Sequence, residues 1–163
     1  MNSKDQDKLF MNLALREARK AAKRLEVPVG AVIIHEGLVV SRGFNKRETG
    51  ADPTAHAEMI AIKAASKRLG SWRLSGTTLY VTLEPCLMCT GAIIQARVGR
   101  LVFGALDPKA GACGSLYDLS TDKRLNHRVH VTSGVCYEES EALLKSFFAD
   151  LRARKKEGRK KPL

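Results

Sequence analysis

Apolar residues recur at helical spacing in four stretches of the chain, as they do along helices that bury one face. The expected helices lie over about residues 5–25, 54–69 and 85–96, and near the C-terminal end. Pro53, near the start of the second helix, and Gly70, just past its end, are residue types that favour helix boundaries. The last helix carries five large apolar residues on one face, namely Leu143, Leu144, Phe147, Phe148 and Leu151.

Five short runs rich in β-branched and other apolar residues lie between these helices. They predict strands over about residues 29–34, 38–44, 77–81, 100–104 and 129–133. The turn signal at Glu36 and Gly37 joins the first two strands into a hairpin. Strands and helices alternate after that hairpin, so we expect an α/β protein with a central five-stranded mixed sheet and helices on both of its faces.

The length and composition fit one globular domain without a membrane span. The chain has 163 residues, of which 44% are hydrophobic, and it shows no internal repeat or linker. Its longest apolar run, residues 27–34, is far shorter than the ~20 residues that cross a bilayer. We expect a single domain over residues 1–156, followed by a flexible basic tail over residues 157–163. No secretory signal is visible at the N-terminus, so a cytoplasmic location is expected.

Positive charge is concentrated at the two ends of the chain. The formal net charge is +11, and residues 150–163 hold seven basic and two acidic residues. Residues 1–24 hold seven basic and three acidic residues. This distribution favours a polyanionic partner such as a nucleic acid. A solvated helix end would have the same composition, so charge alone leaves both interpretations open.

Two short motifs contain the residue types of a catalytic zinc site. Residues 56–58 read H-A-E, and residues 85–89 read P-C-L-M-C. Cys86 and Cys89 are three residues apart at the expected start of a helix, so both sulfurs project from one face, where the helix dipole favours the thiolate. With the imidazole of His56 they form a nitrogen and sulfur set that suits Zn²⁺. Three protein ligands leave the fourth tetrahedral position open, which is typical of a catalytic zinc.

Glu58 is the candidate proton carrier of this site. A carboxylate that stands beside the metal without binding it can take a proton from an activated water and pass protons to the substrate. A redox pair would explain the two motif cysteines but leave the histidine and Glu58 without a role. A structural zinc with four ligands would need Cys113 or Cys136, whose spacing shows no pairing.

The two motifs resemble those of the zinc-dependent nucleoside and nucleobase deaminases. Beyond them, much of the chain from Val27 to Leu151 resembles the bacterial tRNA-specific adenosine deaminases. The matching blocks are residues 27–32, 43–45, 52–58, 83–89, 103–105, 114–116 and 125–129, together with Asp107 and Lys109. The resemblance implies a cytidine-deaminase-like three-layer α/β/α sandwich and a homodimer. It also implies conversion of adenosine to inosine at the wobble position, 34, in the anticodon of an arginine tRNA.

The resemblance also assigns roles to residues by position. It places one zinc ion per subunit on His56, Cys86 and Cys89, and makes Glu58 the catalytic proton shuttle. The residues expected near the anticodon stem-loop are Asn45, Asp107, Lys109, Asn126 and His127. Asn45 has a turn cap as its alternative role. Leu106 and Pro108 depart from the family pattern, which leaves the preference for sequence context open.

The C-terminal helix adds three further candidates. Phe147 and Phe148 could stack on loop bases, although their helical spacing fits core packing equally well. Arg152, which opens the basic end, would contact phosphate.

The expected reaction is hydrolytic deamination of an adenosine that is splayed out of the anticodon loop. A zinc-bound hydroxide would attack C6, and Glu58 would move protons to N1 and to the departing ammonia. One alternative is a deaminase of free cytidine, cytosine, deoxycytidylate or guanine, because these enzymes share the zinc motif. The other is a zinc-containing RNA-binding module without catalysis, which would need four protein ligands.

Overall fold

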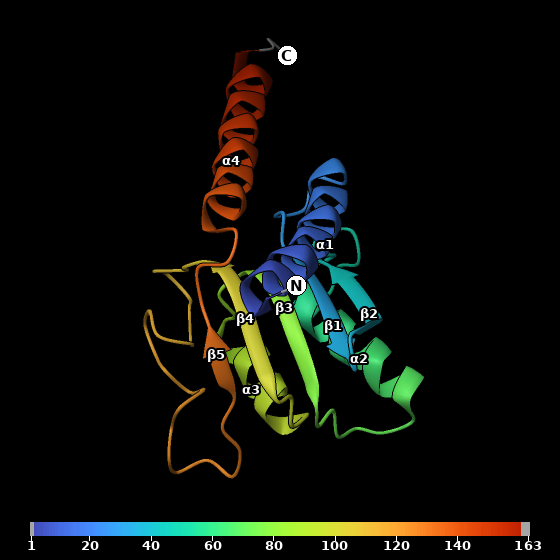
Figure 1. Ribbon diagram of the computed structural model, residues 1–163. Helices are drawn as coiled ribbons and strands as arrows, with labels where there is room; N and C mark the ends of the chain where they lie inside the picture. The colour runs from blue at the N-terminus through green and yellow to red at the C-terminus, as the bar shows by residue number, and fades with distance from the viewer. Residues whose placement is uncertain (1, 161–163) are drawn as a thin grey trace.

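Five strands form one mixed sheet in the computed structural model, which describes residues 2–160 (Figure 1). The strands are β1 (Gly30–His35), β2 (Leu38–Phe44), β3 (Thr77–Leu83), β4 (Arg100–Ala105) and β5 (His130–Thr132). Their order across the sheet is β2-β1-β3-β4-β5. β1 is antiparallel to both β2 and β3, whereas β3, β4 and β5 run parallel. The predicted hairpin and five-stranded mixed sheet are confirmed.

Helices cover both faces of this sheet (Figure 1). They are α1 (Ser3–Lys23), α2 (Ala57–Leu69), α3 (Leu87–Gln95) and α4 (Tyr137–Lys160). Successive residues of β1 point to opposite faces, so Val32 packs with α1 and Ile33 packs with α2 and α3. The result is the expected α/β/α sandwich with one core on each side of the sheet. Within residues 2–160, no helix combines the length and apolar character needed to cross a bilayer.

Glycines in the first two strands allow the helices to approach closely. A Cβ on Gly30 would overlap the backbone of α1, and a Cβ on Gly43 would overlap the backbone carbonyl of Ala57 at the start of α2. Gly43 therefore permits the first turn of α2 to lie directly on β2. This contact fixes the position of His56, which immediately precedes the helix.

Two helices begin later than their sequence patterns predict. α2 begins at Ala57 instead of residue 54, because residues 46–55 form a loop held by its own hydrogen bonds, including one from the backbone N–H of Thr54 to Oδ1 of Asp52. α3 begins at Leu87 instead of Pro85, with Cys86 as its N-cap residue. Both shifts leave the motif residues at the helix entrances.

Helix α4 packs on the sheet only near its beginning and then extends away from it (Figure 1). Ser140 lies against Gly104 of β4, where any larger side chain would collide with it. The helix continues to Lys160, so residues 157–160 of the expected tail are helical. Residues 161–163 lie outside the described part of the chain, and the flexibility of the tail stays a prediction.

Candidate metal centre and reaction pocket

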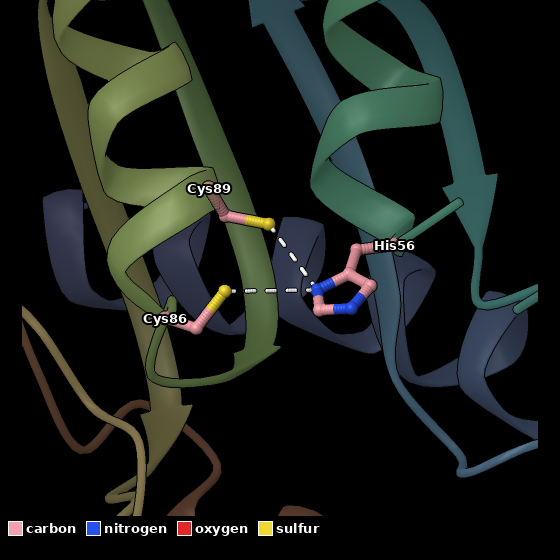
Figure 2. Close-up of side chains that lie close together, drawn as sticks. All are labelled: His56, Cys86 and Cys89. Atoms are coloured by element: carbon pink, nitrogen blue, oxygen red, sulfur yellow. Dashed lines mark hydrogen bonds between the residues drawn. The ribbon is translucent and has the colours of Figure 1, made fainter. Parts of the chain in front are cut away.

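Two helix N-termini bring the sequence motifs together at one end of the sheet (Figure 2). His56 and Cys86 occupy the N-cap positions of α2 and α3, and neither side chain makes a capping hydrogen bond. Instead, they face each other across the gap between the helices, with Cys89 beside them. Nδ1 of His56 lies 3.7 Å from Sγ of Cys86 and 3.5 Å from Sγ of Cys89. The structure thus assembles the three ligands proposed from the sequence.

The spacing of these atoms matches a zinc ion. Tetrahedral zinc bonds of about 2.0–2.1 Å to nitrogen and 2.3 Å to sulfur separate the two ligand atoms by about 3.6 Å. The observed separations of 3.7 Å and 3.5 Å lie on either side of that value. One imidazole and two thiolates are also the donor set that Zn²⁺ prefers. His56, Cys86 and Cys89 therefore form a group that could hold a zinc ion.

Hydrogen bonding prepares Cys86 for a cation. The hydrogen bond from the Cys89 thiol, opposed by burial and aided by His56, lowers the pKa of Cys86 to about 4. Cys86 is consequently a thiolate at neutral pH. The same contact with Cys86, together with burial, raises the pKa of Cys89. Binding of zinc by both sulfurs must therefore release the proton of Cys89.

Glu58 lies in the first turn of α2, beside the ligand cluster and outside it. Its side chain is buried, with 4% of the residue exposed. Burial raises the pKa of Glu58 to about 6, opposed by backbone hydrogen bonding and by His56. A carboxyl group that titrates near neutral pH can both accept and donate a proton, as a proton shuttle requires.

Cys113 and Cys136 do not join the metal site. Sγ of Cys113 lies 3.3 Å from Oγ1 of Thr90, inside the core. Cys136 precedes α4 and packs with the cluster around α1. Among residues 2–160, the cluster has three members and includes neither of these cysteines, which argues against a structural zinc with four protein ligands.

A cleft of about 190 Å³ opens beside Glu58 and the metal ligands. Asn45 and Arg47, from the loop between β2 and α2, line one side of this reaction pocket. Asp107 and Ala110, from the loop after β4, line another. The pocket therefore combines a group that could hold zinc, a buried carboxyl group and two polar loops.

The family follows from a match over more than half of the chain. A family model described as the cytidine and deoxycytidylate deaminase zinc-binding region matches residues 4–105. The chain belongs to this deaminase family. Its metal site is thus that of a zinc-dependent enzyme, as the motif pattern predicts.

Individual relatives cover nearly the whole deaminase. The tRNA-specific adenosine deaminase of Bacillus subtilis (strain 168) is 51% identical over 95% of this chain and 96% of the relative. A solved structure from a study of A-to-I editing by tRNA:A34 deaminases at the wobble position has a TM-score of 0.81 and 47% identity, covering 83% of this chain and 99% of that one. A guanine deaminase structure from Nitrosomonas europaea has a TM-score of 0.74 and 26% identity, covering 87% and 84%. The predicted cytidine-deaminase-like fold is confirmed.

Asn45 and Asp107 line the pocket of the deaminase and also stabilise their own loops. Nδ2 of Asn45 donates to the carbonyl of Val27 at 3.3 Å, and its Oδ1 accepts from the backbone N–H of Arg47 at 3.1 Å. Oδ1 of Asp107 accepts from the backbone N–H of Lys109 at 3.1 Å. Asn45 thus combines the turn role weighed from the sequence with a position at the pocket.

Three other candidates surround a neighbouring surface hollow. Lys109, Phe148 and Arg152 line it together with other residues of α4. Phe148 is 41% exposed, whereas its neighbour Phe147 is only 9% exposed. Phe147 faces α1, where it lines a groove with Leu25. The structure therefore separates the two phenylalanines into one accessible ring and one packed ring.

Asn126 and His127 are not brought to the pocket. The ring Nε2 of His127 donates to the carbonyl of Val98, 2.7 Å away. Val98 precedes β4, whereas the pocket lies beyond the other end of that strand, where Asp107 follows it. Neither residue lines the pocket, so contact of Asn126 and His127 with the substrate stays a prediction.

The sequence interpretation gave no role to Arg47 or Glu84, although both line the pocket. Arg47 stands two residues after Asn45 in the same loop, so the signal was its proximity to a candidate residue. Glu84 directly precedes the Pro85-Cys86 motif, but nothing in that pattern indicates what its carboxylate binds.

Proposed function

We propose that this deaminase converts adenosine to inosine at the wobble position, 34, of a tRNA anticodon, with the arginine tRNA as its substrate. The observation that carries the proposal is the placement of Glu58, buried beside a three-ligand zinc site in a cleft between two polar loops. The name of the Bacillus subtilis relative, which covers almost the whole chain, supports the choice of adenosine in tRNA.

Glu58 carries the protons of the proposed hydrolysis. His56, Cys86 and Cys89 would hold the zinc ion, which would activate a water molecule for attack on C6. Glu58 accepts a proton from that water and delivers protons to N1 of adenine and to the departing nitrogen. Water and adenosine thereby become inosine and ammonia. The raised pKa of Glu58 suits it to both halves of this cycle.

Asn45 has hydrogen-bonding capacity left for the target nucleotide. A side-chain amide offers two N–H donors and two acceptor lone pairs. In Asn45, one donor is used by Val27 and one lone pair by Arg47. One donor and one lone pair remain on a residue that lines the pocket, and we propose that they orient the nucleotide.

The surface around the hollow is proposed to hold the rest of the anticodon stem-loop. Lys109 and Arg152 supply positive charge for phosphates, and the exposed ring of Phe148 supplies a stacking surface. The proposed assembly is a homodimer with one zinc ion per subunit, acting in the cytoplasm where tRNA is found. Sedimentation velocity of the zinc-loaded protein tests the dimer, and a monomer at assay concentrations would contradict it.

The direct test is an inosine assay on an anticodon stem-loop with adenosine at the wobble position. After incubation with zinc-loaded protein, the RNA is digested and inosine is quantified. Free cytidine and guanine serve as parallel substrates. We expect inosine from the RNA and no turnover of the free compounds. Turnover of guanine or cytidine without inosine formation would replace the proposal by a free-nucleobase or free-nucleoside deaminase.

A Glu58→Ala variant checks the mechanism in the same assay. Removal of the proton shuttle should lower the rate about 10²- to 10⁴-fold. Zinc content should stay at the wild-type value, because Glu58 is outside the ligand cluster. Wild-type activity in this variant would refute the assigned role.

A further inference from the structure

Each of the two loops that line the reaction pocket is attached to a buried glutamate. Glu26 is 0% exposed and Glu84 is 2% exposed. Within the described part of the chain, neither carboxylate forms an ion pair with a Lys, Arg or His side chain. Both instead accept hydrogen bonds from backbone N–H groups of a pocket loop.

Glu84 holds the loop after β4. Its Oε1 accepts from the backbone N–H of Asp107 at 3.1 Å and from the hydroxyl of Ser115. Its Oε2 accepts from the N–H groups of Cys113 and Ser115, each at 3.1 Å. One carboxylate therefore joins both ends of the segment 107–115. A side chain at Gly111 would collide with this carboxylate, so the loop closes tightly around it.

Glu26 holds the loop between β2 and α2. One of its oxygens accepts from the backbone N–H of Glu48 at 3.1 Å, and the other accepts from that of Thr49. Burial raises the pKa of Glu26, but these hydrogen bonds outweigh burial and lower it below the ordinary value. The side chain is consequently ionised at neutral pH. Arg47, which lines the pocket, directly precedes the held residues.

Burial of a carboxylate is costly unless hydrogen bonds compensate for the lost water. A carboxylate accepts several N–H groups at once, whereas an amide of the same shape would direct its own NH₂ at some of them. Two acceptor oxygens on one side chain are therefore needed at each of these places to satisfy the N–H groups of the loop. Neither glutamate is among the three metal ligands.

We infer that Glu84 and Glu26 are positioning residues, each of which fixes one wall of the reaction pocket and thereby the place at which that wall meets the RNA. Glu84 acts through Asp107, and Glu26 acts through Arg47. The RNA part of this inference rests on the proposed function. The loop part does not, because it concerns the protein alone.

Two matched variants test the inference in the full-length, zinc-loaded protein. Glu84→Gln and Glu26→Gln keep the shape of the side chain and replace one of its two acceptor oxygens by an NH₂ donor. Amide hydrogen exchange measured by mass spectrometry reports local opening of each loop. Glu84→Gln should accelerate exchange in residues 106–118 about 10-fold or more and leave residues 46–55 unchanged. Glu26→Gln should give the opposite pattern.

Kinetics with the stem-loop separate positioning from general stability. Each variant should raise the KM for RNA about 10-fold or more, change kcat less, and keep the zinc content of the wild type. Glu36→Gln, in the turn between β1 and β2, is the matched surface control and should change none of these values. A lowered melting temperature with an unchanged KM would assign the glutamates a merely structural role and overturn the inference.

A milder variant keeps the inference testable if the buried substitutions prevent folding. Ser115→Ala removes one donor to Glu84 from an exposed position, and should accelerate exchange of residues 106–118 about 3-fold. Equal opening of both loops in either glutamate variant, or no opening in any variant, would overturn the inference. Absence of inosine from wild-type protein would refute the proposed function alone, since the exchange patterns would still decide the anchoring roles.

Discussion

The metal centre and the outer half of α4 differ in how their residues act. At the metal centre, one potential ligand atom from each of three residues at two helix entrances lies within 4.8 Å of the others, close enough for one ion to bind all three. The outer half of α4, residues 149–160, extends away from the sheet (Figure 1). Residues 152–159 within it are exposed, and five of them are basic: Arg152, Arg154, Lys155, Lys156 and Arg159.

This difference predicts two kinds of response to substitution. A tetrahedral site has few ligands, so loss of one removes the function of the others. Exposed charges act on a polyanion through a summed potential, and each contributes a similar, salt-dependent amount. Loss of any one ligand should therefore abolish zinc binding at the metal centre. Each basic residue removed from the outer half of α4 should instead weaken RNA binding by a similar step.

The largest effect is expected from removal of one metal ligand. Cys86→Ala should lower the zinc content far below one ion per chain and reduce turnover about 10³-fold or more, because the activation supplied by zinc is worth several kcal/mol. Atomic absorption and the inosine assay measure the two quantities. Cys136→Ala is the matched control, since this cysteine is also half-buried but lies outside the ligand cluster. Full zinc content in Cys86→Ala would show that the ligand set is wrong.

A smaller and graded effect is expected from the outer half of α4. Replacement of four basic residues by Gln should weaken RNA binding about equally for different sequences and reduce the slope of log K against log salt by about three. The four residues are Arg152, Arg154, Lys155 and Lys156. Binding titrations at several salt concentrations measure the slope.

An equal charge change on α1 provides the control for that experiment. The exposed residues Lys4, Lys8, Arg16 and Arg19 offer the same number of positive charges on another helix. Their replacement should change the slope less than replacement in α4. An equal change in both variants would mean that net charge, and not contact by α4, determines the binding.

The sequence alone was sufficient to predict those features that depend on residues close together along the chain. The spacing of Cys86 and Cys89 and the two-residue step from His56 to Glu58 place these groups on helix entrances in any fold that forms the helices. The alternation of strand and helix signals after the hairpin likewise predicted the mixed sheet with helices on both faces, and each face carries a core. The metal centre and the fold class therefore followed from local patterns.

The sequence was insufficient where partners lie far apart along the chain. Glu84 receives its hydrogen bonds from residues 23 to 31 positions away, and Glu26 from residues 22 and 23 positions away. No periodicity relates such positions. His127 shows the same difficulty, since only the folded chain places its ring on the carbonyl of Val98. Loops around the pocket depend on tertiary contacts that a one-dimensional pattern does not contain.

The smallest effect on RNA binding is expected at the two phenylalanines of α4, of which one packs in the protein and the other is exposed for binding. Helical spacing placed both on an apolar face, but Phe147 packs against α1 whereas Phe148 is 41% exposed beside Lys109 and Arg152. Phe148→Ala should weaken stem-loop binding by about 1–3 kcal/mol, the range for loss of one stacked base. Its melting temperature should fall less than that of Phe147→Ala, because Phe148 is 41% exposed whereas Phe147 is 9% exposed.

Phe147→Ala should show the reverse pattern. Loss of a buried aromatic ring costs about 3–5 kcal/mol of folding free energy, whereas RNA affinity of the remaining folded protein should change little. Urea unfolding and binding titrations on both variants separate the two quantities. The contrary result would be a fully folded Phe147→Ala protein that binds RNA as weakly as Phe148→Ala does. Both rings would then belong to the RNA surface, and the boundary between packed and binding residues of α4 would lie closer to the sheet.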